Sequence, residues 1–231
     1  MLQPTTISEL KSLLENWKEW DIVPNDIDTS RITKMNGLFT GSEKLSLFNE
    51  PIGNWNTKNV TDMRYMFSHA CSFNQPIGKW NTEMVTNMDN MFDHAFSFNQ
   101  PIGNWNTGRV RIMRFMFNRA ESFNQPLTWD TQNVKNMRGM FYHAESFNQP
   151  LNWNTGIVTD MGNMFYCAKS FDQDLNNWNI KKVSSMTGMF KGATRFLFHS
   201  AMDQDHMTWD TTNVQNKRRM FDEYYAEMCP L

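Results

Sequence analysis

Apolar residues return along this chain with a period of 24 or 25 residues. The tryptophans mark the period, because Trp55, Trp80 and Trp105 are 25 residues apart and Trp129 and Trp153 follow at intervals of 24. A fixed period in this range is typical of solenoids, in which each repeat is one supersecondary unit and stacked neighbours share a continuous core.

Within one unit, two segments have different spacings. Val60, Met63, Met66, Phe67 and Ala70 recur at steps of three and one, which places them on one face of a short helical turn. The segment 48–55 is rich in Asn, Pro and Gly, and we predict a short strand there, with a bulge where a unit has 25 residues. The fold class that follows is an α/β repeat solenoid of about eight coils, each built from a short strand and a short helical turn.

The start of the chain does not fit the repeat. Thr6 and Glu9 form the pattern of a capping box, and apolar residues then recur at three- and four-residue steps, so an amphipathic helix from about Ser8 to Trp20 is predicted. Such a helix would cover the apolar end of the first coil. A membrane-surface helix is the alternative, but its polar face carries both signs of charge, which favours the cap.

Three regions follow from this pattern. We expect a capping helix and turn over 1–26, the solenoid over 27–221 with an insertion at 194–208, and a C-terminal cap over 222–231. Lys217 takes a position that Met holds in other units, and a charge there indicates a terminal coil that meets water.

The composition shows what fills the core. The chain has 19 Met, 18 Phe and 9 Trp, and stacking would align them in columns, so we read these stripes as packing and expect no cofactor. The polar residues after the first Phe of each unit are expected to hydrogen-bond neighbouring backbone. They are Asn49, Asn74, Asn99, Asn124, Asn148 and Asp172.

The repeat pattern resembles a known family. Phe-Asn-Gln-Pro-Ile/Leu-x-x-Trp-Asn/Asp-Thr-x-x-Val-x-x-Met-x-x-Met-Phe, over about 27–221, is similar to the BspA-like leucine-rich repeat, also called the mycoplasma lipoprotein-associated repeat. The resemblance implies a leucine-rich-repeat-like solenoid. Its members are mostly surface or adhesion-type proteins of bacteria, with related arrays in protists, algae and large DNA viruses, and no catalytic residues come with it.

Net charge and targeting signals limit the cellular compartments in which we expect this protein. A net charge of −2 gives no bias toward nucleic acid or anionic membranes. The N-terminus has neither a basic nor an apolar signal region, so we expect an intracellular, reducing or virion-associated protein rather than a classically secreted one. Cys71 and Cys167 are expected to be free thiols, whereas Cys229 could link two molecules.

One column of polar residues could bind a metal. His69, His94 and His143 share a repeat position, which Arg119 and Cys167 occupy in other coils. Two of these histidines would lie on adjacent coils about 5 Å apart, close enough to share an ion. Because Arg119 stands where a third ligand would be, we favour a solvated ladder and expect no metal.

Basic residues gather on neighbouring units and could bind nucleic acid, with Phe115 stacking on a base. Acidic residues such as Asp89, Asp93 and Asp160 lie at comparable positions, which argues against that partner. We favour instead a non-enzymatic protein-interaction or structural module, in a virion or cell-surface assembly by family analogy and compatible with self-assembly. Its candidate surface comprises Lys58, Asp62, Arg64, Tyr65, Arg109, Arg111, Arg114, Arg119, Lys135 and Arg138.

The alternative is an enzyme or a ligand- or metal-binding protein that uses the 194–208 insertion. A pocket lined by His199, Asp203, Asp205 and His206 would favour this alternative.

Overall fold

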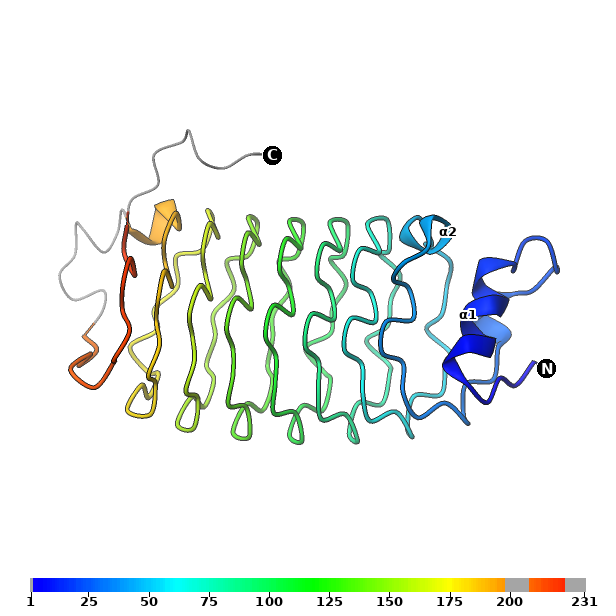
Figure 1. Ribbon diagram of the computed structural model, residues 1–231, viewed down its shortest axis with the longest axis horizontal. Helices are drawn as coiled ribbons and strands as arrows, with labels where there is room; N and C mark the ends of the chain where they lie inside the picture. The colour runs from blue at the N-terminus through cyan, green and yellow to red at the C-terminus, as the bar shows by residue number, and fades with distance from the viewer. Residues whose placement is uncertain (1, 198–207, 223–231) are drawn as a thin grey trace.

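The computed structural model describes residues 2–197 and 208–222, and the statements below concern these residues. The chain winds through a row of similar coils stacked along the longest axis of the molecule, with the N-terminal helix at one end (Figure 1). The helices are α1 (Ile7–Glu15), the 3-10 helix η1 (Pro24–Asp26) and α2 (Glu43–Ser46), and 194–197 form a further helical turn.

The predicted alternation of strand and helical turn is wrong. Between 47 and 193 no residue is helical, and no strand extends beyond a single paired residue. The pairing also lies after the Val of each unit rather than in 48–55. Parallel bridges join one residue of each coil to its neighbour in the order Lys34, Asp62, Asn87, Ile112, Asn136, Asp160, Ser185 and Asn216.

The hydrogen bonds show why the Met-rich stretch cannot be a helix. The N–H groups of Met63, Tyr65, Phe67 and His69 all donate to carbonyls of the following coil, at 2.7 to 3.1 Å. Of the N–H groups between them, those of Met66 and Ser68 donate three residues back, and that of Arg64 donates to the Asp62 side chain. A helix needs its N–H groups for bonds four residues back. The spacing of the apolar residues at steps of three, three, one and three therefore belongs to a coil built from turns. This coil buries the same residues as a helical turn would.

In each coil between 34 and 193, two residues adopt left-handed backbone conformations. In one coil these are Tyr65 and His69, with φ of 55° and 61°. Non-glycine residues accept this conformation at a cost of about 1 kcal/mol or more. The bonds to both neighbouring coils and the buried Met and Phe side chains between them hold the backbone there.

The extra residue of the longer units is accommodated by a turn, not by the predicted bulge. The Trp55 N–H donates to the Ile52 carbonyl at 3.2 Å, which closes a turn over 52–55. A Cβ on Gly53 would lie 2.8 Å from the Pro76 carbonyl oxygen of the next coil. Glycine in this turn therefore lets the two coils approach.

The predicted core columns are confirmed. Phe67 and Phe92 stack with ring centroids 5.4 Å apart, and Trp55 and Trp80 with centroids 6.0 Å apart. The indole N–H of Trp80 donates to the Ile52 carbonyl of the preceding coil at 3.2 Å. The polar groups inside the column are thus satisfied, as burial requires.

Two polar columns also join the coils. The hydroxyl of Thr57, which is 1% exposed, donates to the Asn81 carbonyl of the following coil at 2.9 Å. The Asn49 Oδ1 accepts from the Asn74 N–H at 2.8 Å, and the same bond recurs through the column. The backbone hydrogen bonds expected of these asparagines are confirmed.

Helix α1 closes the N-terminal end of the stack. The Thr6 side chain accepts from the Glu9 N–H at 3.2 Å, as the capping-box pattern predicts. The helix ends at Glu15, before the predicted Trp20, because the Asn16 side chain donates to the Ser12 carbonyl and the chain turns away. Leu10 and Leu14 are 0% and 1% exposed and belong to the common core.

The other end of the described stack is more polar. Lys217 is exposed, and its ammonium group lies 3.3 Å from the Thr211 hydroxyl. This agrees with a terminal coil. Most of the expected C-terminal cap, from 223 onward, lies outside the described residues.

Candidate functional site

The predicted surface residues all lie on the outward side of the bridge-forming stretch. In the coil of Asp62, Met63 is buried, whereas Lys58, Arg64 and Tyr65 are exposed. The equivalent stretches of later coils carry the other members of the surface. We call the outward side chains of 58–69 and of the equivalent stretches the bridge face.

Hydrogen bonds between coils show which of these residues are neighbours. The Lys135 N–H donates to the Arg111 carbonyl at 2.9 Å, so these two residues are adjacent in one column. Arg64, Arg114 and Arg138 share another column, in which Asp89 lies between the first two. Arg119 lies in the column of His69, His94 and His143, which we call the histidine column, away from this basic group.

The basic residues of the bridge face are interleaved with carboxylates. Arg114 donates to both oxygens of Asp89, at 3.1 and 2.7 Å, and the Asp89 side chain is only 3% exposed. This hydrogen bonding raises the pKa of Arg114 further above its usual value. Arg64 pairs with Asp62 in its own coil at 2.7 Å. The face is therefore a row of ion pairs and differs from the positive groove that follows a phosphate backbone.

Arg111 and Lys135 are exposed and form no ion pair with the residues that the structure describes. Arg109 contacts the Met84 sulfur, at 3.2 Å from its Nη1. These cations are the part of the bridge face that is open to a partner's carboxylates.

The histidine column contains a polar cluster that sequence reasoning missed. The rings of His69 and His94 stack with centroids 4.5 Å apart, close to the predicted spacing. Asp93 lies beside both, because its Oδ1 is 2.7 Å from His94 Nδ1 and its Oδ2 accepts from the Ser68 hydroxyl at 3.3 Å. The Ser68 Oγ is in turn 3.0 Å from His69 Nδ1.

The sequence has Arg119, which is no metal ligand, at the position where a third ligand would be, one coil further along the same column. The carboxylate comes instead from the residue before His94. The His69 N–H donates to the Asp93 carbonyl at 2.7 Å, so the hydrogen-bonded register between the coils is offset by one residue from the side-chain column. The adjacent Asp93-His94 pair was the available sequence signal.

His143 has the same repeat position but a different environment. It is 7% exposed, and desolvation lowers its pKa to about 4, with a smaller contribution from the charge of Arg119. His143 is therefore neutral near pH 7. Cys71 and Cys167 form no disulfide among the residues that the structure describes, as expected.

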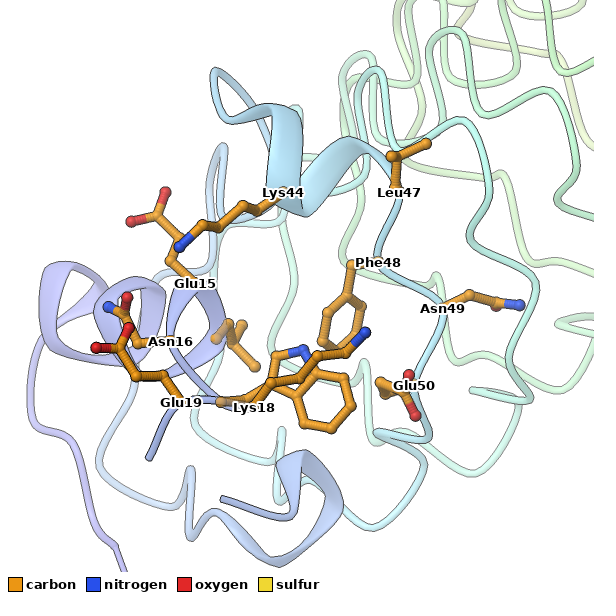
Figure 2. A pocket seen from close by; sticks show the side chains of 11 residues that line it. Glu15, Asn16, Lys18, Glu19, Lys44, Leu47, Phe48, Asn49 and Glu50 are labelled. Carbon is orange, nitrogen blue, oxygen red and sulfur yellow. The ribbon is translucent and has the colours of Figure 1, made fainter. Parts of the chain in front are cut away.

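A groove lies between α1 and the segment that follows α2 (Figure 2). It has a volume of about 360 Å³, and its lining includes Glu15 at the end of α1, Lys18 and Glu19 from the turn that follows, and Lys44 and Leu47 from α2 and the residue after it. The lining residues include no Ser, Thr, Cys or His. The groove consequently presents no hydroxyl, thiol or imidazole, and its charged lining consists of carboxylates and ammonium groups.

The family model described as "Mycoplasma protein of unknown function, DUF285" matches residues 7–128 and 127–226. The chain belongs to this family. The two consecutive matches in this DUF285 protein agree with the repeated coils, and the join at 127–128 falls just before Trp129. No curated protein and no solved structure matches the chain.

Two further points concern membranes and the insertion of this DUF285 chain. None of the helices described here has the length and apolar character needed to cross a bilayer. His199, Asp203, Asp205 and His206 of the insertion lie outside the described residues.

Proposed function

We propose that this DUF285 protein is a non-enzymatic interaction module that binds a protein partner along the bridge face. The supporting observation is that the core positions are alike from coil to coil while the outward positions differ. One column runs through Thr33, Thr61, Thr86, Arg111, Lys135 and Thr159 on a backbone held by bonds of 2.9 to 3.0 Å. A constant framework thus presents a row of different side chains.

The dimensions suit a protein partner. Seven bridges connect Lys34 to Asn216, and at about 4.8 Å per step the row is about 34 Å long. That length is comparable to the diameter of a standard interface, which buries about 800 Å² on each partner. The exposed Tyr65 and the cations Arg111 and Lys135 are of the residue classes that contribute to such interfaces.

The resemblance to BspA-like repeats supports the same proposal, because those arrays occur mostly in surface and adhesion-type proteins. A role in a cell-surface or virion assembly is consistent with it. This part of the proposal rests on family analogy alone.

Charge reversal on the bridge face tests the proposal. The full chain is used as bait in a quantitative pull-down from its native source, beside the double variant Arg111→Glu/Lys135→Glu. A matched double variant, Lys44→Glu/Lys79→Glu, makes the same change in net charge at exposed positions outside the bridge face. We expect the wild-type chain to capture a protein in stoichiometric amount. Recovery of this protein should fall at least about tenfold with the bridge-face variant and stay unchanged with the matched variant.

Equal recovery with both variants would place the partner elsewhere on the molecule. A wild-type chain that captures no stoichiometric protein and forms no defined assembly by light scattering would contradict the proposal. Circular dichroism of both variants shows whether the coils are intact.

A further inference from the structure

We propose that His69, Asp93 and His94 form a binding site for a divalent transition-metal ion of the zinc class. The site is on the bridge face, between two adjacent coils. One ligating atom from each of the three side chains lies within 4.8 Å of the other two.

Each imidazole directs its Nδ1 into this polar cluster, His94 at the carboxylate itself and His69 at the Ser68 hydroxyl. His94 Nδ1 is 2.7 Å from Asp93 Oδ1. His69 Nδ1 is 3.0 Å from the Ser68 Oγ, which is itself bonded to Asp93 Oδ2. An ion between the two Nδ1 atoms and the carboxylate would replace the proton that now lies between His94 and Asp93.

The carboxylate is held in place by groups that are not ligands. The Asn118 side chain donates to Asp93 Oδ1 at 2.6 Å, and the Ser68 hydroxyl donates to Oδ2. With its amide nitrogen committed to Asp93, Asn118 has a buried Oδ1 without a hydrogen-bond partner among the described residues. Hydrogen bonds of this kind orient a ligating carboxylate and commonly accompany metal sites.

Only side chains need to move when the ion binds. Zinc bonds to nitrogen and oxygen of about 2.0 to 2.2 Å place tetrahedral ligand atoms about 3.4 Å apart. The widest separation in the present cluster, which is within 4.8 Å, must therefore shrink by up to about 1.4 Å, and the His94 Nδ1–Asp93 Oδ1 pair must open from 2.7 Å. The rings are stacked 11° from parallel, and one must tilt so that both lone pairs point to a common centre. His69 is exposed and can tilt, whereas His94 is fixed by Asp93.

The donor set selects the class of ion. Two imidazoles and one carboxylate suit zinc and its neighbours, whereas calcium takes six or more oxygens. Three protein ligands also leave a coordination position for water. The guanidinium of Arg119, one coil further on, acts electrostatically on His143, which lies on the far side from His94.

Calorimetric titration of the full-length, tag-free, metal-depleted chain with Zn²⁺ tests the site, and Co²⁺ absorption reports imidazole coordination. We expect one ion per chain. The substitutions His69→Asn, His94→Asn and Asp93→Asn should each weaken binding by no less than the 10–100-fold typical of losing an outer-shell partner. Asparagine is chosen because it tolerates the left-handed backbone of the two histidines, as Asn90 and Asn163 do.

Two control variants assign any ion to its site. His143→Asn changes a histidine of the same column, and His199→Asn/His206→Asn removes both histidines of the insertion; neither should alter the affinity. Binding that survives the His69 and His94 substitutions but disappears with the insertion variant would overturn the proposal. So would a wild-type chain that shows no saturable Zn²⁺ binding at millimolar concentration. Thermal melts of the apo-proteins distinguish a lost ligand from a lost fold.

Discussion

The substitution Gly139→Ala should destabilise the stack for two separable reasons. Gly139 has a φ of +60°, which an alanine adopts only with strain. A Cβ there would also lie 2.2 and 2.3 Å from two ring carbons of Phe115 in the preceding coil. A real contact cannot be that short, so the aromatic ring or the backbone must shift.

Two other glycines separate these costs. Gly41 has a φ of +70° with nothing within 4 Å of the added Cβ, so Gly41→Ala measures the conformational strain alone. We expect about 1 kcal/mol, since strain of about 1 to 2 kcal/mol is partly offset by the lower entropy of the unfolded chain. Gly108 has no positive φ, and a Cβ there would meet only side-chain oxygens, the nearest being Asp130 Oδ2 at 3.3 Å, so Gly108→Ala should change stability by no more than about 1 kcal/mol in either direction.

Overpacking adds about 1 to 3 kcal/mol, so Gly139→Ala should cost about 2 to 4 kcal/mol. Urea unfolding followed by tryptophan fluorescence measures this cost through the midpoint. The variants must share one m-value, because long repeat arrays can lose cooperativity. In a Phe115→Gly background the cost should fall to that of Gly41→Ala. The steric argument would be refuted if Gly139→Ala were no less stable than Gly41→Ala. It would also be refuted if the double-mutant cycle of Gly139→Ala and Phe115→Gly showed no coupling energy.

Three further predictions use the same unfolding assay. Replacing Thr107 by Val should cost about 1 kcal/mol, because its buried hydroxyl donates to a carbonyl of the next coil at 2.8 Å, whereas the exposed Thr128→Val should stay within about 0.5 kcal/mol. The depressed pKa of His143, about 4 against 6.5, means that the unfolded chain binds more protons between these values. Stability should therefore fall as pH falls from 6.5 to 4, by up to about 1.4 kcal/mol per pH unit, and the wild-type minus His143→Asn difference isolates this dependence. Arg114→Ala leaves a buried carboxylate without its bidentate donor and should cost about 1.5 to 3 kcal/mol, whereas Arg64→Ala, which breaks a more exposed pair, should cost less than about 1 kcal/mol.

Periodicity alone predicted the stacking and the core. The regular return of Trp55 and its equivalents required a repeat, and burial of these side chains follows from stacking. The capping helix was also predictable, because Thr6 and Glu9 form a local signal that needs no tertiary context. The C-terminal end of this helix was not predictable, because it depends on the hydrogen bond from the Asn16 side chain to the Ser12 carbonyl.

The local structure of the coils could not be read from apolar spacing. A helical turn and a coil of turns bury Met63, Met66 and Phe67 equally well. The distinguishing signal lies in the positions between them, where Asn90, Asn163 and several glycines take left-handed conformations. Residues that favour this conformation, recurring at fixed offsets inside an apparent helix, argue against the helix.

The candidate sites were predictable to different degrees. Outward positions such as Arg64 and Arg111 follow from alternation with the buried residues. The neutralisation of Arg114 by Asp89 and the approach of Asp93 to His69 depend on contacts between coils, whose one-residue offset is a property of the backbone bonds. Aligning the repeats of the sequence with one another does not reveal that offset.

The tryptophan hydrogen bonds give the molecule a direction. Each indole N–H finds its acceptor in the coil before it, as Trp178 does at the Leu151 carbonyl and Trp209 at the Leu175 carbonyl. The indole of a coil leaving the ribosome therefore meets an acceptor that is already in place, beginning from the surface that α1 closes. We expect the stack to grow by templating from its N-terminal end, so that removing a coil there leaves the next indole N–H without its acceptor, whereas removing one from the far end leaves the indole bonds of the remaining coils intact.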